Sequence, residues 1–166
     1  MSITILSRLE GNTLLIRGEG VIDREVIGDK FQRLRVYLKE LEKFKNISWR
    51  EFPSSLENQW KVFHGLQLSI QIVIDVGNHI LAAIGESQIE DYTDIIDKLG
   101  ERNIISAEFA QSIRGMVGLR NILIHEYSSI DLNKVYDVLQ NKLDDFYKFI
   151  EYIEDYLNKK IEKQNY

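Results

Sequence analysis

From Asp23 to Leu157, hydrophobic residues recur every three or four positions, and this spacing constrains the fold more than any other feature of the chain. A period near 3.6 residues places such side chains on one face of an α-helix, and that face must be buried against other helices. The sequence contains a single proline, Pro53, and proline does not fit inside a regular helix. The pattern therefore predicts an all-α fold, an antiparallel bundle of four to five helices with short connections.

Residues that start or stop helices divide this pattern into segments. Side chains of Asp, Ser and Thr commonly cap the first turn of a helix, and Gly commonly follows the last turn. We expect one helix over about 23–45 with Asp23 as its cap, one from Ser54 or Ser55 to Gly85, and a short one over about 91–99 ended by Gly100. A further helix follows Ser106, and a last one starts at Asp131 and continues to about residue 157.

The first twenty residues have a different pattern. Segments 2–9 and 13–17 are rich in β-branched residues, and Gly11-Asn12 between them is typical of a tight turn. A lone hairpin is marginally stable in water, so it must dock on the helices or on a partner. We therefore divide the chain into a hairpin extension, residues 1–20, and a helical bundle domain, residues 21–163.

Composition excludes several functional classes. The chain has 166 residues, no cysteine and a formal net charge of −5, which argues against broad non-specific binding to nucleic acid. A basic stretch from Lys98 to Arg120 leaves room for a small basic cleft. The sequence contains no zinc-ligand motif and no phosphate-binding glycine loop, so we expect no metal and no cofactor. It also has neither a hydrophobic run long enough for a membrane span nor a secretion signal, so a cytoplasmic location with no membrane partner is expected.

The octapeptide at residues 120–127, Arg-Asn-Ile-Leu-Ile-His-Glu-Tyr, carries the chemistry. On a helix its polar groups do not share one face, because Arg120 aligns with Tyr127 while Asn121 aligns with His125. An ordinary surface helix separates polar from hydrophobic residues. This interleaving indicates that both sides are buried, against the chain's own bundle and against a second protein surface.

The spacing Arg120-x4-His125 resembles the Arg-x4-6-His signature of HEPN domains, and its extended form, with Asn121 and Tyr127, is similar to the HepT toxin family. The resemblance extends over about residues 22–157, and the hairpin is the departure from it. Three further stretches agree with the family in order and spacing: residues 71–81, 116–119 and 131–136.

The resemblance implies a metal-independent ribonuclease toxin that acts as a homodimer. Arg120 and His125 of both subunits would line one cleft, as catalytic residues that act on RNA, either tRNA or mRNA. An imidazole suits proton transfer near neutral pH, and a guanidinium suits a phosphate. Asn121 would orient His125 or hold the phosphate. The family also implies a cognate minimal nucleotidyltransferase antitoxin, which neutralises the toxin by transferring AMP to Tyr127.

Asp75, Asn78 and His79 form a polar stripe at spacings i, i+3 and i+4, to which Gln71 belongs. One interpretation is that they support the site by positioning the segment with Arg120. The other is that they form a polar network that fixes helix pairing. For the whole chain, the alternative to a nuclease is a non-catalytic HEPN scaffold, the binding subunit of a nucleotidyltransferase.

Overall fold

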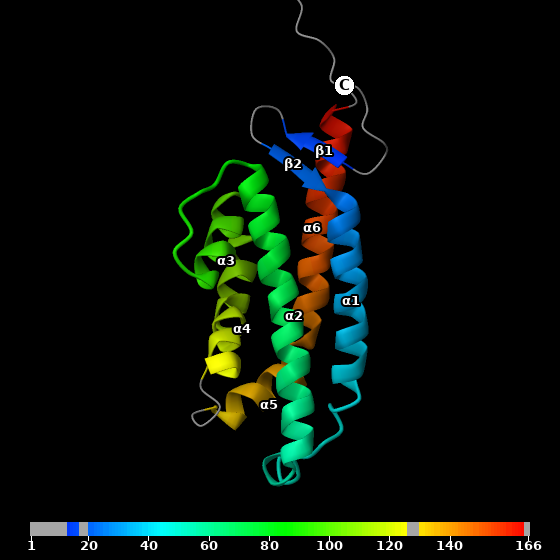
Figure 1. Cartoon of the computed structure of the whole chain (residues 1–166), viewed down its shortest axis with the longest axis vertical. Helices are drawn as coiled ribbons and strands as arrows, with labels where there is room; N and C mark the ends of the chain where they lie inside the picture. The colour runs from blue at the N-terminus through cyan, green and yellow to red at the C-terminus, as the bar shows by residue number, and fades with distance from the viewer. Residues whose placement is uncertain (1–12, 17–19, 126–129, 165–166) are drawn as a thin grey trace, which may run out of the picture.

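Helix α2, Leu56–Ala83, is the central element of the structure, a computed structural model that describes residues 13–16, 20–125 and 130–164. Helices α3 and α4 lie on one side of α2, and α1 and α6 lie on the other (Figure 1). By length and composition, α2 is the one described helix that could cross a membrane, but 61% of its most apolar stretch is buried inside the bundle. The predicted all-α bundle is confirmed, with six α-helices in the described chain.

Helices α1 and α2 begin where their capping residues predict. Helix α1 spans Arg24–Glu42, and the Asp23 carboxylate accepts hydrogen bonds from the backbone N–H groups of Glu25 and Val26. The connection to α2 contains the short 3-10 helix η1, Phe52–Ser54, in which Pro53 is accommodated without loss of a helical hydrogen bond. Ser55 then caps α2. These capping predictions are confirmed.

Helices α3, Tyr92–Glu101, and α4, Ala107–His125, form a closely packed pair. The predicted stop at Gly100 is wrong by a residue, because Gly100 lies inside α3. A Cβ there would come within 2.9 Å of the Ala110 Cβ of α4, so the glycine permits close helix contact. The reversal falls instead at Asn103, whose φ of 55° is in the left-handed region that asparagine tolerates. Ser106 accepts a hydrogen bond from the backbone of Phe109, in agreement with its predicted role.

The last predicted helix is two helices. Helix α5, Leu132–Asn141, starts at its cap Asp131, and α6, Leu143–Gln164, follows after a break at Lys142. Figure 1 shows α5 crossing the lower end of the bundle, whereas α6 runs along its length. Tertiary contacts hold α5 in this direction, since Tyr136 and Gln140 donate side-chain hydrogen bonds to the carbonyls of Ile47 and Lys45. No proline or glycine marks the break.

The hairpin pairs strand β1, Thr13–Ile16, with β2, Gly20–Asp23, in antiparallel register. The connection between them is therefore residues 17–19, and the predicted turn at Gly11-Asn12 and its first strand, 2–9, lie outside the described residues. Strand β2 docks on the end of α2: Ile22 is fully buried, and a Cβ on Gly20 would meet the Ala83 backbone at 3.0 Å. The division of the chain at residue 20 stays an expectation.

Candidate active site

The segment that the sequence singles out forms the last turns of α4. Leu123 is fully buried in the core, Arg120 is half-buried and Asn121 is exposed. Polar and hydrophobic residues are therefore interleaved here, as the helical spacing predicts. The helix ends at His125, whose side chain lies outside the described part of the chain, and Tyr127 lies within residues 126–129, which the structure does not describe.

The guanidinium of Arg120 is held by two neighbours from other helices. Its Nε donates a hydrogen bond of 2.9 Å to Oε1 of Gln71 on α2. Its central carbon lies 4.6 Å from the centre of the Tyr92 ring on α3, a cation–π contact. One edge and one face of the guanidinium are thus occupied. Within the described residues, neither terminal nitrogen of Arg120 has a hydrogen-bond partner.

The amide of Gln71 is itself oriented by a second pair of contacts. Its Nε2 donates a 2.6 Å hydrogen bond to Oδ1 of Asp75, and Oδ2 of Asp75 pairs with the Lys30 ammonium of α1 at 2.8 Å. Because the amide nitrogen faces the carboxylate, the amide oxygen faces Arg120. The contacts from Lys30 through Asp75 and Gln71 to Arg120 therefore join three helices. Below we call this chain of contacts the α1–α2–α4 polar network.

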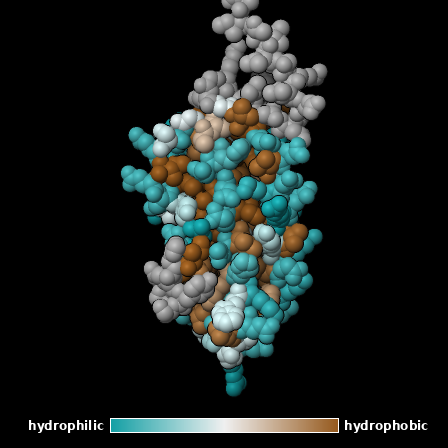
Figure 2. Space-filling view, viewed as in Figure 1, coloured by the Kyte–Doolittle hydropathy of each residue, from teal (hydrophilic) through white to brown (hydrophobic). Residues whose placement is uncertain are grey.

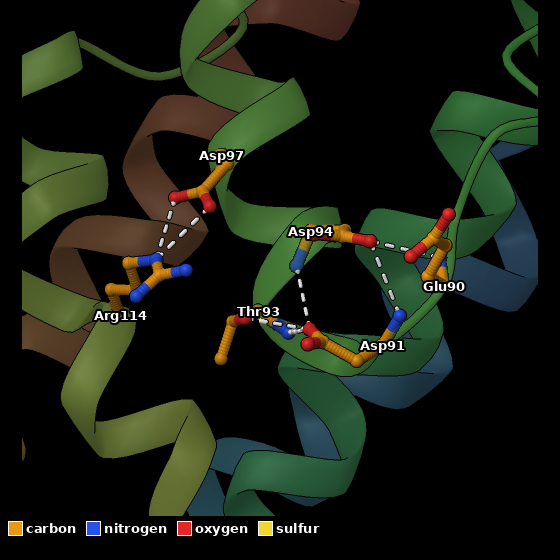
Figure 3. A network of polar contacts seen from close by, with 6 residues as sticks. All are labelled: Glu90, Asp91, Thr93, Asp94, Asp97 and Arg114. Carbon is orange, nitrogen blue, oxygen red and sulfur yellow. Dashed lines mark hydrogen bonds and ion pairs between the residues drawn. The ribbon is translucent and has the colours of Figure 1, made fainter.

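The other cations of the basic stretch are neutralised by carboxylates. Lys98 and Arg102 both pair with Glu86, at 3.1 Å and 2.6 Å. Arg114 pairs with Asp97 across α3 and α4, and this hydrogen bond raises the pKa of Arg114 above its usual value (Figure 3). In the part of the chain that the structure describes, Arg120 is the one cation of this stretch whose direct partners are all neutral. Among the described residues, Arg120 is therefore the cation of this stretch that has no carboxylate partner.

A hollow of about 590 Å³ lies beside Arg120, between α2, α3 and α4. Gln71 and Tyr92, the two residues that hold the guanidinium, both line it. Glu90 and Asp91, just before α3, also line it, and Figure 3 shows their side chains beside Thr93 and Asp94. A hydrogen bond from the Thr93 hydroxyl and others from the α3 backbone hold the pKa of Asp91 below its usual range. The remaining lining residues are Ile74, Asp75, Asn78, Ile89, Ile95 and Asn121.

The structure separates the four residues for which the sequence suggested a supporting role. Asp75, Asn78 and Asn121 line the hollow, and Asp75 also contacts Gln71. His79 is not among the lining residues. Its Nε2 accepts a 3.1 Å hydrogen bond from the backbone N–H of Asp23, at the junction of β2 and α1. Asp75 therefore contacts the residue that holds Arg120, whereas His79 joins α2 to the junction of β2 and α1. The two interpretations of the stripe apply to different residues, and the supporting role of Asp75 stays a prediction.

The sequence did not reveal Tyr92 and Lys30 as neighbours of the site. Tyr92 precedes Arg120 by 28 positions and lies on another helix, and Lys30 is 90 positions away. Their proximity arises from tertiary packing, so no local motif indicates it. One indirect signal was present: Gln71 and Asp75 are polar at helical spacing on an otherwise hydrophobic helix, which implies polar partners across the interface.

Comparison with known proteins gives one consistent family. Residues 34–153 match the protein-family model described as ribonuclease HepT-like. The chain is 33% identical over 136 residues to the tRNA nuclease HepT of Aphanizomenon flos-aquae, a match that covers 82% of this chain and 92% of that protein. It is 28% identical over 129 residues to the mRNA nuclease HepT of Shewanella oneidensis, with 78% and 96% covered.

Solved structures of similar proteins agree. A toxin–antitoxin complex with AMP-PNP matches with a TM-score of 0.73 at 27% identity, over 79% of this chain and 98% of that one. The tri-AMPylated Shewanella oneidensis HEPN toxin in complex with MNT antitoxin matches with a TM-score of 0.71 at 27% identity, over the same shares of the two chains. The cytosolic protein YutE of Bacillus subtilis, at 18% identity over 83% of this chain and 92% of that one, shares the fold, with a TM-score of 0.72. Fold, motif and sequence similarity agree, and the chain belongs to the HepT-like ribonuclease family.

Proposed function

We propose that the protein is the ribonuclease toxin of a toxin–antitoxin pair, located in the cytoplasm, and that it cleaves RNA without a metal ion at a site shared by two subunits. The observation that carries the proposal is the guanidinium of Arg120, held by neutral neighbours with both terminal nitrogens free of partners in the described chain. A permanently cationic, planar fork of this kind binds phosphate oxygens in pairs. A scaffold has no need of an oriented, unpaired arginine.

The chemistry that suits these residues uses the RNA itself as the nucleophile. The ribose 2′-hydroxyl loses its proton to a base and attacks the adjacent phosphorus. The bond to the 5′-oxygen of the next nucleotide breaks, and that oxygen takes a proton from an acid. The products are a cyclic phosphate and a free 5′-hydroxyl. Arg120 stabilises the negative charge that builds on the non-bridging oxygens. His125 is the residue for proton transfer.

A homodimer supplies the second proton-transfer group. One His125 acts as the base and the His125 of the other subunit as the acid, so two copies of the chain meet along one cleft. Support for a second protein surface comes from α4, where exposed Asn121 and half-buried Ile122 and Ile124 lie side by side in the sequence near the helix end. Figure 2 shows the same intermingling of hydrophobic and hydrophilic side chains over the visible face of the bundle.

The partner that restrains the toxin is a minimal nucleotidyltransferase, and the residue it modifies is Tyr127. Support comes from the structural relatives, of which one is described as tri-AMPylated and bound to an MNT antitoxin. Transfer of AMP to Tyr127 adds a negatively charged group two residues after His125. Such a group repels an RNA phosphate and blocks the approach to Arg120. The two HepT relatives compared above are named as a tRNA nuclease and an mRNA nuclease, so for this chain we propose RNA in general, with tRNA and mRNA both to be tested.

Digestion of total RNA by the purified protein tests the nuclease directly. We expect cleavage in the presence of EDTA, fragments that end in cyclic phosphates, and loss of cleavage in Arg120→Ala and His125→Ala. The matched control is Arg114→Ala, an arginine on the same helix whose exposed ion pair with Asp97 contributes little to stability. Intact RNA after incubation with folded wild-type protein would favour the scaffold.

Two further measurements test the shared site and the antitoxin. Mixed dimers of the wild-type and His125→Ala chains retain only one of the two histidines that the proposed mechanism needs, so we expect them to lose most of the activity although half of their chains are wild type. A mixed dimer with half of the wild-type activity would contradict a shared site. Co-expression with the nucleotidyltransferase should add the mass of AMP to the peptide that contains Tyr127, and an unmodified peptide would contradict this part of the proposal.

A further inference from the structure

The hollow beside Arg120 raises a question that the proposed function leaves open, because a ribonuclease site is expected to attract phosphate. Of the described residues that line the hollow, three are carboxylates, Asp75, Glu90 and Asp91, and none is a lysine or arginine. An acidic hollow repels the RNA backbone. Its occupant must therefore be something other than phosphate, although it lies next to the residue best suited to bind phosphate.

The position of the hollow relative to Arg120 is fixed by two shared residues. Gln71 contacts the guanidinium through Oε1, and Tyr92 contacts it through its ring, and both line the hollow. Arg120 is therefore separated from this hollow only by the two residues that it contacts, and a phosphate bound by its terminal nitrogens would lie close to the hollow. The group attached to that phosphate is a nucleoside, whose neutral base is what an acidic hollow admits.

The lining has the chemistry of a base pocket. Ile74 and Ile95 are buried, at 3% and 2% exposed, and give it an apolar floor against which a flat ring packs. The exposed amides of Asn78 and Asn121 have no hydrogen-bond partner among the described residues. Glu90 is exposed, and its carboxylate likewise has none in that part of the chain. The lining therefore combines an apolar surface with unused polar groups, most of which accept hydrogen bonds.

The balance of donors and acceptors selects the kind of base. The Glu90 carboxylate only accepts hydrogen bonds, whereas each asparagine contributes one accepting oxygen and an amide group that donates. Both oxygens of Asp75 are already engaged, by Gln71 and Lys30. Oδ1 of Asp91 already accepts hydrogen bonds from Thr93 and Asp94, so within the described residues its Oδ2 is the oxygen left as a further acceptor. Adenine, cytosine and guanine carry an exocyclic amino group that donates to such acceptors, whereas uracil does not. We propose that the hollow binds a nucleobase with an exocyclic amino group, adjacent to the phosphate held by Arg120. This inference rests on the proposed nuclease function and names its substrate preference.

The test compares RNA substrates that differ by one amino group. Short oligoribonucleotides with a single cleavable junction carry adenine or purine, which lacks only the amino group, on the 5′ or on the 3′ side of the junction. Cytosine and uracil form a second pair. We expect removal of the amino group on one side to lower kcat/KM roughly ten-fold, the size of discrimination that good base contacts provide. Equal rates for adenine and purine on both sides would overturn the proposal.

A variant of one lining residue then assigns the preference to the hollow. Glu90→Gln, which exchanges an accepting oxygen for a donating amide, should reduce the adenine-to-purine ratio. The matched control is Glu108→Gln, an exposed glutamate in the first turn of α4, which should leave that ratio unchanged. If Glu90→Gln left the adenine-to-purine ratio unchanged and weakened the self-association of the protein, the hollow would be a contact between protein chains. That result would overturn the proposal.

A binding measurement separates failure of this inference from failure of the nuclease. NMR titration of the protein with adenosine 3′-monophosphate and with purine riboside 3′-monophosphate requires no cleavage. Tighter binding of the adenosine compound, lost in Glu90→Gln, supports the base pocket even if no RNA is cut. Equal binding of the two compounds overturns the base pocket. If the protein binds them equally but still cleaves RNA, the base pocket is wrong and the proposed nuclease function stands.

Discussion

Replacement of Gln71 by alanine gives the sharpest test of how the arginine is held. The substitution removes Oε1, the acceptor of the 2.9 Å hydrogen bond from Arg120, and breaks the α1–α2–α4 polar network in its middle. The variant keeps every charge of the network, because the glutamine is neutral. Any loss of activity therefore reports on the orientation of the guanidinium rather than on net charge.

The expected magnitude follows from the contact. A hydrogen bond to a charged group contributes about 1.5–3 kcal/mol, and because Arg120 is half-buried we take the lower end, about 1.5 kcal/mol. Since each 1.36 kcal/mol in the activation free energy changes a rate about ten-fold, kcat/KM should fall roughly ten-fold. Most of the change should appear in kcat if the guanidinium binds the transition state more strongly than the substrate.

The assay is steady-state cleavage of a labelled RNA, with thermal unfolding measured on the same preparations. Gln67→Ala is the matched control, because Gln67 is a half-buried glutamine one turn earlier on α2 that lines a separate hollow with Trp60. It should keep kcat/KM within about two-fold of the wild type. A folded Gln71→Ala protein with unchanged kcat/KM, or equal losses in the two variants, would refute the positioning argument.

Substitutions at three other positions test separate features. Tyr92→Leu removes the ring against Arg120 and should lower kcat/KM about three- to thirty-fold, the range of cation–π energies, whereas Tyr92→Phe keeps the ring and should recover most of the activity. Asp91→Ala removes the cap of α3 and should lower the free energy of unfolding in urea by about 1 kcal/mol. Because hydrogen bonds lower the pKa of Asp91 in the folded state, its contribution is full above pH 3.8, so the deficit should shrink as the pH falls through the folded pKa. Burial, and then the hydrogen bond to Glu42, raise the pKa of Tyr147 to about 12, so Tyr147→Phe should remove one late transition from an alkaline absorbance titration. The stability that the neutral phenol of Tyr147 contributes should be complete below about pH 10 and should decline between about pH 10 and about pH 12. If Tyr147 titrated together with the other tyrosines, this prediction would be wrong.

The start of each helix was predictable because the signals are local. Asp23, Ser55, Ser106 and Asp131 all lie at or beside the beginning of a described helix. A cap needs only a side-chain oxygen and the next two or three backbone N–H groups, so the sequence carries all the information. The family motif is local for the same reason, since Arg120 and His125 share one helix.

What the sequence missed depends on contacts between distant segments. The break at Lys142 separates two helices whose hydrophobic stripe is continuous. The change of direction is accompanied by hydrogen bonds from α5 to the first part of the α1–α2 connection, at Lys45 and Ile47. Gly100 resembled a helix stop but provides close contact with Ala110. Tyr92 and Lys30 belong to the surroundings of the site through packing of α3 and α1 against α2, which no spacing rule encodes.

The fixed guanidinium has a stereochemical consequence. The two non-bridging oxygens of an RNA phosphate are prochiral, so sulfur in place of one or the other gives two distinct diastereomers. An arginine free to rotate would serve either oxygen, but Arg120 is restrained along one edge by Gln71 and across one face by Tyr92. Its terminal nitrogens approach from a single direction, so the site should distinguish the two phosphorothioates. That handedness originates in three helices that the backbone brings together.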